Sequence, residues 1–142
     1  MSRPDRVVVD TGVLLAAADE DDRWHTHASS LLEERPAEQL ILPATVAVEA
    51  AWLIASRLGA PTEAAFVASV AADEFTLTDL TGADWSRCAE LTKRYLDLGL
   101  GLVDASVVAV AERLRVTTVA STDRRDLLVV RPAHCDAFEL IP

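Results

Sequence analysis

Four carboxylates occupy places in the sequence where a charge is costly. Asp10, Glu49 and Asp104 are each the sole charged residue of a long apolar stretch. Asp123 follows closely on another apolar run, which ends at Ala120. An isolated buried carboxylate is strongly destabilising, so each of these acids needs a compensating partner. If the four lie together, they either raise one another's pKa or are neutralised by a hard divalent cation.

The residue types around such a cluster indicate its chemistry. A ligand set made of oxygen atoms, without His or Cys, favours Mg²⁺ or Mn²⁺ over Zn²⁺. Mg²⁺ keeps several of its waters, which can act as the nucleophile and can bridge to phosphate oxygens. The cluster therefore predicts metal-assisted hydrolysis of a phosphodiester.

Three other interpretations compete with this one. Asp10 and Asp104 could each be a helix N-cap while Glu49 bonds a backbone amide, although a mid-helix glutamate fits that account poorly. The chain could be a different metal-dependent phosphodiesterase or phosphatase; a phosphatase or phosphotransferase with Asp10 as covalent nucleophile would want a second Asp at position 12, which is Gly. The third alternative is a non-catalytic acidic groove that binds a basic peptide.

Strands alternate with helices along the chain, which predicts an α/β fold with a central, mostly parallel twisted sheet of four or five strands. An acid that follows a buried parallel strand stands where such sheets collect their ligands. Gly12 is expected to let the chain turn from the first strand into a helix. Strands are expected at 7–9, 39–42, 75–80, 116–120 and 138–141, and helices at 13–18, 24–35, 43–58, 62–72, 81–96 and 103–115.

Helical spacing directs two of the acids inward. Glu49 shares a helix face with Thr45 and Trp52, and Asp104 shares one with Val108. Both carboxylates should therefore point at the core or into a cleft beside it. Trp52 and Trp85 lie on apolar stripes, which predicts core or dimer contacts for both.

Composition and charge limit the class of protein. The 142 residues are 51% hydrophobic, the size and composition of one globular domain spanning 1–142. No signal-like layout is visible, and the longest nearly uncharged stretch, 40–56, is shorter than the ~20 residues of a membrane span. Cys88 and Cys135 lie far apart, as expected of two free thiols in a reducing, cytoplasmic compartment. The net charge of −10 disfavours binding of nucleic acid, whose backbone is also negatively charged, and favours binding of a basic partner.

An ordered set of short motifs carries a family resemblance. The set contains Val-Asp-Thr-Gly at 9–12, a Glu at 49 within an Ala/Val-rich helix, Leu-Val-Asp-Ala at 102–105 and Ser-Thr-Asp-Arg-Arg-Asp at 121–126. The whole chain resembles the PIN-domain family, and in particular the VapC toxins of bacterial toxin–antitoxin modules. The resemblance implies a PIN-like three-layer α/β/α fold.

The same resemblance implies a function and partners. It implies a Mg²⁺-dependent endoribonuclease, with Mn²⁺ as a substitute metal, that is the toxin of a type II toxin–antitoxin module. It also implies a homodimer that forms a heterotetramer or larger complex with a cognate antitoxin, whose basic tail enters the acidic site. RNA is the implied substrate.

Carried over residue by residue, the resemblance assigns roles to the acids. Asp10 and Asp104 match the principal metal ligands, and Glu49 and Asp123 match the other two catalytic, metal-binding acids. Asp126 lies close enough in sequence to replace Asp123 as the fourth acid.

Neighbouring residues receive supporting roles. Thr11 and Thr122 match hydroxyl residues that orient the carboxylates. Arg124 and Arg125 are the candidates for contact with RNA, which an acidic protein can attract only through a metal-loaded site and local cations.

Overall fold

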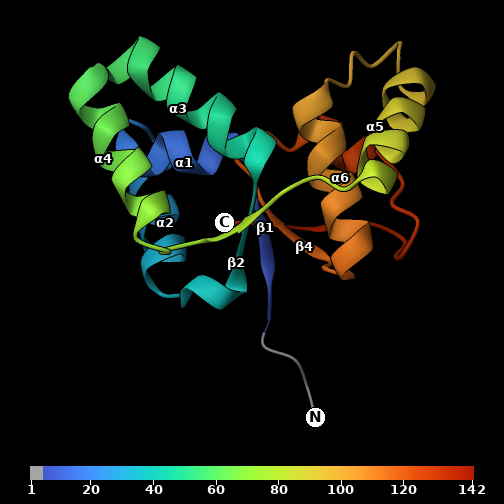
Figure 1. Cartoon of the computed structure of the whole chain (residues 1–142), viewed down its shortest axis with the longest axis horizontal. Coiled ribbons are helices and arrows are strands. Elements are labelled where there is room, and N and C mark those ends of the chain that lie inside the picture. Colours follow the sequence, from blue (N-terminus) through green and yellow to red (C-terminus); the bar gives the residue numbers. More distant parts are fainter. Residues whose placement is uncertain (1–4) are drawn as a thin grey trace.

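A computed structural model, which describes residues 5–142, shows a five-stranded sheet in which every pairing is parallel (Figure 1). The order of the strands is β3-β2-β1-β4-β5, so the first strand of the chain lies at the centre. The strands are β1 (Val7–Val9), β2 (Leu40–Pro43), β3 (Thr76–Thr78), β4 (Thr118–Ala120) and β5 (Glu139–Ile141).

Helices cover the sheet on both sides and complete three layers, which confirms the expected PIN-like α/β/α fold. Figure 1 shows α1 to α4 on one side of the strands and α5 and α6 on the other. The helices are α1 (Thr11–Ala18), α2 (His25–Glu33), α3 (Ala44–Leu58), α4 (Ala60–Ala71), α5 (Gly82–Arg94), α6 (Leu102–Leu114) and α7 (Arg125–Val129), with one 3₁₀ turn at Ala37–Gln39.

The centre of the sheet is fully enclosed. All residues of β1 and β2 are buried, as their unbroken apolar sequences predict. The edge strand β3 exposes both Thr76 and Leu77, so its residues do not alternate in burial as they alternate in polarity. In α6, seven consecutive residues, 105–111, are buried because the helix packs against α5, α3 and the central strands. Asp104 immediately precedes this buried run.

Local sequence signals explain several helix ends. Pro43 immediately precedes α3, and α5 begins with a capping box in which Thr81 and Asp84 bond each other's backbone N–H groups. The helix expected from residue 62 begins earlier, at Ala60, so Pro61 lies in the first turn of α4. A proline lacks the N–H that the first turn leaves unpaired anyway, so Pro61 starts this helix.

Two other expectations are wrong, and a third is wrong in part. The short helix α7 was not predicted, because five residues are too few to show a period. Trp52 and Trp85 are 67% and 50% exposed, so neither is a core residue, and the dimer contact that was the alternative for both stays a prediction. Gly12 has no positive φ and lies inside α1, so it does not serve as a turn residue.

Within residues 5–142, no helix has the length and apolar character needed to cross a membrane.

Candidate functional site

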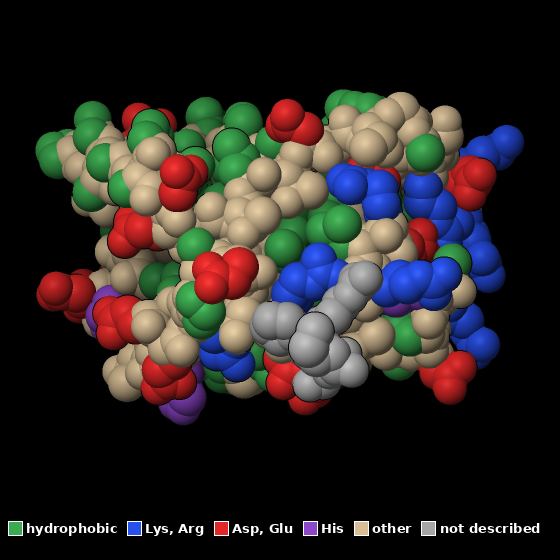
Figure 2. All heavy atoms as spheres, turned by 60° about the horizontal axis from the view of Figure 1, so that its bottom comes forward, with side chains coloured by type: hydrophobic (Ala, Val, Ile, Leu, Met, Phe, Trp, Pro, Cys, Tyr) green, Lys and Arg blue, Asp and Glu red, His purple; other side chains and the backbone are tan. Residues whose placement is uncertain are grey.

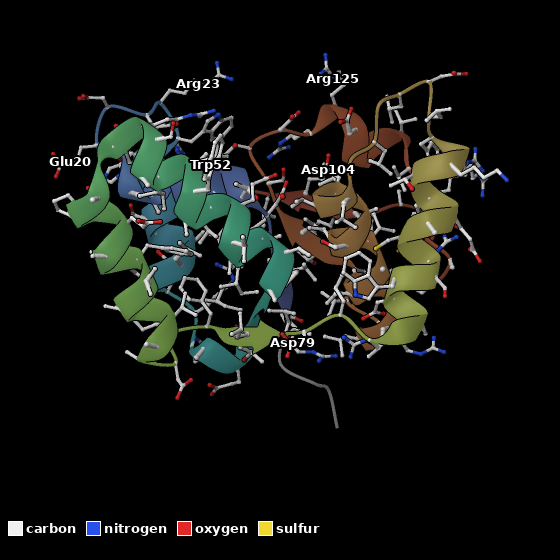
Figure 3. All side chains as sticks on the ribbon, turned by 45° about the horizontal axis from the view of Figure 1, so that its top comes forward. Glu20, Arg23, Trp52, Asp79, Asp104 and Arg125 are labelled. Carbon is white, nitrogen blue, oxygen red and sulfur yellow. The ribbon has the colours of Figure 1, made fainter. Side chains whose placement is uncertain are left out.

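The register of β1 and β4 brings the two strand-end segments together. Val9 pairs with Ala120, and the Asp10 N–H donates to the Ala120 carbonyl over 2.9 Å. Asp10 and the chain after β4 therefore meet at the carboxyl edge of the sheet, the edge where α/β proteins bind ligands. Figure 3 shows Asp104 toward the same end of the molecule as Arg125, with Asp79 at the opposite end.

Asp10 is 6% exposed and is held by two neutral donors. Its Oδ1 accepts from the Thr11 N–H at 2.8 Å, and its Oδ2 lies 3.0 Å from the Ser121 Oγ. Burial raises the pKa of Asp10, and the charges of Glu49 and Asp123 raise it further, against the effect of these two hydrogen bonds. Asp10 thus caps α1 and also carries an uncompensated charge.

Asp104 occupies the first turn of α6, whose N-cap is Gly101, so it is not the cap itself. Burial raises the pKa of Asp104 to about 7, and the carboxylates of Asp10, Asp126, Glu49 and Asp123 contribute to the rise, in that order. The charges of four other acids therefore act on Asp104 at this edge of the sheet.

Glu49 approaches the site through a contact between two helices. The Ser106 hydroxyl of α6 donates to the Val103 carbonyl at 2.6 Å, so the Thr45 hydroxyl of α3 donates to Ser106 across 2.5 Å. This bond fixes α3 against the start of α6. Glu49 lies one helical turn beyond Thr45, on the same face.

Asp123 and Asp126 both belong to the cluster. Asp123 is exposed and its charge acts on Asp10 and Asp104. Asp126 lies in the first turn of α7, is 19% exposed and ranks ahead of Asp123 in its effect on Asp104. Both therefore stay candidates for the fourth acid.

With this geometry established, comparison with known proteins identifies the family. The PIN domain model matches residues 7–131. The chain belongs to the PIN domain family. Ribonuclease VapC26 of Mycobacterium tuberculosis is 29% identical over 136 residues, which span 96% of this chain and all of that protein. The resemblance to VapC-type PIN domains is thereby confirmed.

Solved structures agree on the PIN fold. VapC20 of Mycobacterium tuberculosis, described as a toxin that cleaves the sarcin–ricin loop, has a TM-score of 0.73 and 21% identity over 80% of this chain and 86% of its own. FitAcB of Neisseria gonorrhoeae and VapBC2 of Rickettsia felis, bound to a promoter DNA fragment, have TM-scores of 0.66 and 0.65. FitAcB is 14% identical and the match covers 96% of this chain and 96% of its own. VapBC2 is 12% identical and the match covers 94% of this chain and 96% of its own.

Sequence reasoning missed Ser121 of this PIN domain. Its hydroxyl lies 3.0 Å from Asp10 Oδ2 and 2.8 Å from the Asp123 carbonyl oxygen, and its oxygen accepts from the Asp123 N–H. One hydroxyl proton serves one acceptor at a time, so Ser121 links the position of the Asp123 backbone to the hydrogen bonding of Asp10. The strand-end position of Ser121, directly after Ala120, was the signal available in the sequence.

The two predicted threonines lie near the site in different ways. Thr11 contacts Asp10 through its backbone N–H, and its buried hydroxyl has no hydrogen-bond partner among the described residues. Thr122 lies over the first turn of α1. A Cβ on Gly12 would approach the Thr122 Oγ1 to 2.3 Å, so the glycine permits this close contact.

The two predicted arginines differ in availability. Arg124 is partly buried and donates to the Pro142 carbonyl. Arg125 is 83% exposed, with its Nε 3.8 Å from Asp126. Arg125 is thus the better placed of the two to meet a ligand.

The donor chemistry of the site fits a hard divalent cation. Among residues 5–142, no group of three or more Asp, Glu, His or Cys side chains is arranged as a ready metal cage. Mg²⁺ needs no such cage, because it is commonly held by one or two carboxylates and keeps its waters. Asp10 and Asp104 supply two carboxylates of this kind: burial and the neighbouring acids raise the pKa of both, and neither forms an ion pair within residues 5–142.

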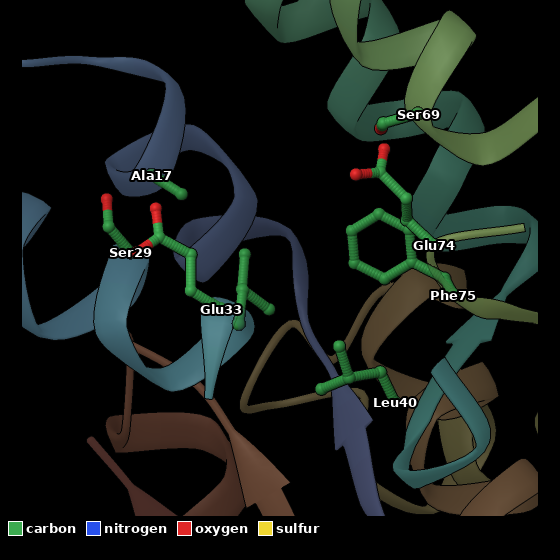
Figure 4. A pocket seen from close by; sticks show the side chains of 8 residues that line it. Ala17, Ser29, Glu33, Leu40, Ser69, Glu74 and Phe75 are labelled. Atoms are coloured by element: carbon green, nitrogen blue, oxygen red, sulfur yellow. The ribbon is translucent and has the colours of Figure 1, made fainter. Parts of the chain in front are cut away.

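Of two hollows in the surface, one lies beside the site acids and the other at the opposite edge of the sheet, where β2 begins at Leu40. An apolar groove borders Glu49, with Val48, Trp52 and Leu102 among its lining residues. A second groove separates Ser29 and Glu33 of α2 from Ser69, Glu74 and Phe75 (Figure 4). This second groove holds none of the predicted site acids, so it is not the candidate catalytic centre.

Proposed function

We propose that this PIN domain, spanning residues 1–142, is a Mg²⁺-dependent endoribonuclease, the toxin of a type II toxin–antitoxin module. The observation that carries the proposal is the convergence of Asp10, Glu49, Asp104 and two further acids at one sheet edge, where burial and mutual repulsion raise the pKa of Asp10 and Asp104. None of the ion pairs formed within residues 5–142 includes Asp10, Glu49 or Asp104. A divalent cation with a phosphate ligand would supply the missing positive charge.

Asp10 and Asp104 would hold the cation, with Mn²⁺ as a substitute. When bound, Mg²⁺ supplies an acidified water as nucleophile and offsets the charge of the phosphate. Glu49 and Asp123, or Asp126 in its place, would accept hydrogen bonds from waters at the site and orient them. Ser121 and the Thr11 N–H fix the Asp10 carboxylate so that it does not rotate out of position.

The reaction is hydrolysis, in which the oxygen of water bonds to phosphorus and the P–O3′ bond breaks. The products are a 5′-phosphate and a 3′-hydroxyl. The RNA 2′-hydroxyl is not the nucleophile, because the site is built from carboxylates and contains no His acid–base pair among the predicted residues.

Analysis of the fragment ends tests this mechanism. Mass spectrometry of cleaved RNA should show 5′-phosphate and 3′-hydroxyl ends, no 2′,3′-cyclic phosphate, and no cleavage in EDTA. Cyclic phosphate ends, or full activity without a divalent metal, would exclude it. The same assay separates the non-catalytic alternative, which predicts binding without cleavage.

We propose that the partner is an antitoxin with a basic tail, which enters the acidic site. Arg side chains form bidentate pairs with carboxylates, and the net charge of −10 favours a basic segment. Relatives named as a toxin–antitoxin complex from Klebsiella pneumoniae and as VapBC2 support this context. Binding should weaken with added salt, and an antitoxin that inhibits without reaching the site would contradict the proposal.

A homodimer is proposed on the apolar groove beside Glu49. Val48 and Trp52 are 72% and 67% exposed, which is costly for large apolar side chains in water. A second copy covering this groove would bury them, and assembly with antitoxin would then give a heterotetramer or larger complex in the cytoplasm, where RNA is available. Light scattering should report a dimer for the wild type and a monomer for Trp52→Lys.

A further inference from the structure

The charges of the chain divide between two parts of the fold. Residues 19–74, which include α2, α3 and α4, carry 11 Asp and Glu against 3 Arg. Residues 84–131, which include most of α5, all of α6 and α7, carry 7 acids against 8 Lys and Arg. Figure 2 brings the bottom of Figure 1 forward and so views the face away from the candidate site; on this face, Lys and Arg side chains gather on the right and acids are scattered over the left. A polyanion would therefore be repelled by the α2–α4 part.

Several cations of the α5–α7 part are already used by the fold. Arg87 forms a two-pronged pair with Glu112, and Arg113 pairs with Asp84 at 2.9 Å. Arg124 donates to the Pro142 carbonyl. These three side chains stabilise the packing of the molecule. Their guanidinium groups already donate to protein acceptors, so they are less able to bind a large ligand.

Five other cations of this part face solvent: Lys93, Arg94, Arg115, Arg125 and Arg131. Arg115 follows the end of α6 that is opposite Asp104, and we name the other four the site-end cations. Among the described residues, the recorded ion pairs include one of the four, the 3.8 Å contact between Arg125 and Asp126. Arg125 projects from α7 at the same end of the molecule as Asp104, which lies in the first turn of α6 (Figure 3).

Tyr95 connects this group to the candidate site. The Arg94 guanidinium lies 5.5 Å from the centre of the Tyr95 ring, and the Tyr95 hydroxyl accepts from the Arg131 N–H at 3.0 Å. The turn that starts at Tyr95 leads directly into α6, where Asp104 lies in the first turn. The end of α5 and the segment after α7 are thus held together by a hydrogen bond. Each of them is close along the chain to a site acid, α5 to Asp104 and the segment after α7 to Asp126.

We propose that the site-end cations bind the phosphodiester backbone of RNA on one side of the scissile phosphate, so that the strand crosses the α5–α7 part and avoids the α2–α4 part. This inference rests on the proposed function. An Arg guanidinium matches a phosphate with two parallel hydrogen bonds, and the contact of Arg94 with the Tyr95 ring restricts the freedom it would lose on binding. Lys93 and Arg94 lie in the last turn of α5, where positive charges also stabilise the helix by interacting with its dipole. Arg125 and Arg131 lie outside α5, so this effect does not account for their positions.

The test compares two double variants with the same change in charge. Arg94→Gln/Arg131→Gln removes two site-end cations, and Arg35→Gln/Arg57→Gln removes two arginines of the α2–α4 part. Binding is measured with a single-stranded RNA of about 20 nucleotides in an Asp10→Asn background, in which cleavage is expected to fall at least about a hundred-fold. We expect the site-end pair to lower the slope of log K against log salt by about 1.4 and affinity roughly tenfold, and the control pair to change neither by more than about twofold.

Cleavage by the active protein gives a second readout. The site-end pair should raise KM for the long RNA with kcat unchanged, and should leave cleavage of an oligonucleotide of about four nucleotides unaffected, since this covers the acids alone. Arg94→Lys/Arg131→Lys should restore most of the salt slope, because the positive charge is kept. Equal losses in both Gln pairs, or an unchanged slope in the site-end pair, would overturn the inference. If the wild type cleaves no RNA at all, the proposed function fails instead.

Discussion

Two buried aspartates of this protein have opposite surroundings. Asp84, at the start of α5, is 4% exposed and accepts from the Thr81 N–H and from Arg113 Nε. Asp10, at the end of β1, is 6% exposed and is held by the Thr11 N–H and by Ser121, neither of which carries a charge. One carboxylate is paired with a cation, and the other is surrounded by further acids.

The difference separates a structural acid from a candidate catalytic one. A buried carboxylate with a cation and a cap contributes to the stability of the fold. A buried carboxylate that other carboxylates repel lowers stability, and such a cost is expected where a ligand is to be bound. The same Asp-to-Asn exchange should therefore act in opposite ways at these two positions.

The largest effect is expected for Asp10→Asn. Asparagine keeps an acceptor for the Thr11 N–H but removes the charge that would hold a cation, so RNA cleavage should fall at least about a hundred-fold. Thermal unfolding should show a melting temperature equal to or above that of the wild type. Retention of cleavage would remove Asp10 from the site.

Asp84→Asn should do the reverse. It leaves the partly exposed Arg113 without its anion and weakens the capping box, at a cost of about 2 to 3 kcal/mol in the free energy of unfolding. Cleavage per folded molecule should stay within about twofold of the wild type, since Asp84 lies outside the acidic cluster. Urea titration and an activity assay on the same samples check both statements. A stability unchanged by Asp84→Asn would contradict the contrast with Asp10.

A pH titration sharpens the comparison further. The pKa of Asp104 is raised to about 7, so between about pH 4 and 7 the native state keeps a proton that the unfolded chain has lost. The free energy of unfolding should therefore fall as pH rises through this window, by about 1 to 2 kcal/mol from Asp104 once partial exposure is allowed for.

Asp104→Asn isolates this contribution. In metal-free buffer, the variant should become more stable than the wild type above pH 7, and the difference should shrink toward pH 4. Urea unfolding of both proteins at several pH values gives the difference directly. A constant difference across the window would show that Asp104 does not titrate as its surroundings require.

Metal binding should give the smallest change. At about five times its Kd, Mg²⁺ should stabilise the wild type by about 1 kcal/mol, which raises the melting temperature by a few degrees. Asp10→Asn/Asp104→Asn should show no such rise, whereas Asp84→Asn should keep it. An equal response in the double variant would place the metal elsewhere.

Much of the fold and of the acidic cluster could be predicted from the sequence, because the signals are local. Val7–Val9 has no polar alternation, so it must be an inner strand, and Asp10 directly follows it. Thr81 and Asp84 have the spacing of a capping box, which the structure confirms. A lone acid in an apolar helix, such as Asp104, indicates a functional site, and this signal does not depend on which elements the helix packs against.

Tertiary structure decided what depends on contacts between distant segments. Ser121 reaches Asp10 across 111 positions through the register of β1 and β4, and Gly12 is required by the close approach of Thr122. Arg124 and Arg125 are adjacent residues of the same type, yet Arg124 donates a hydrogen bond to the Pro142 carbonyl and Arg125 faces solvent. No short-range pattern encodes such differences, because they arise only when the packed sheet brings separate segments to the same edge.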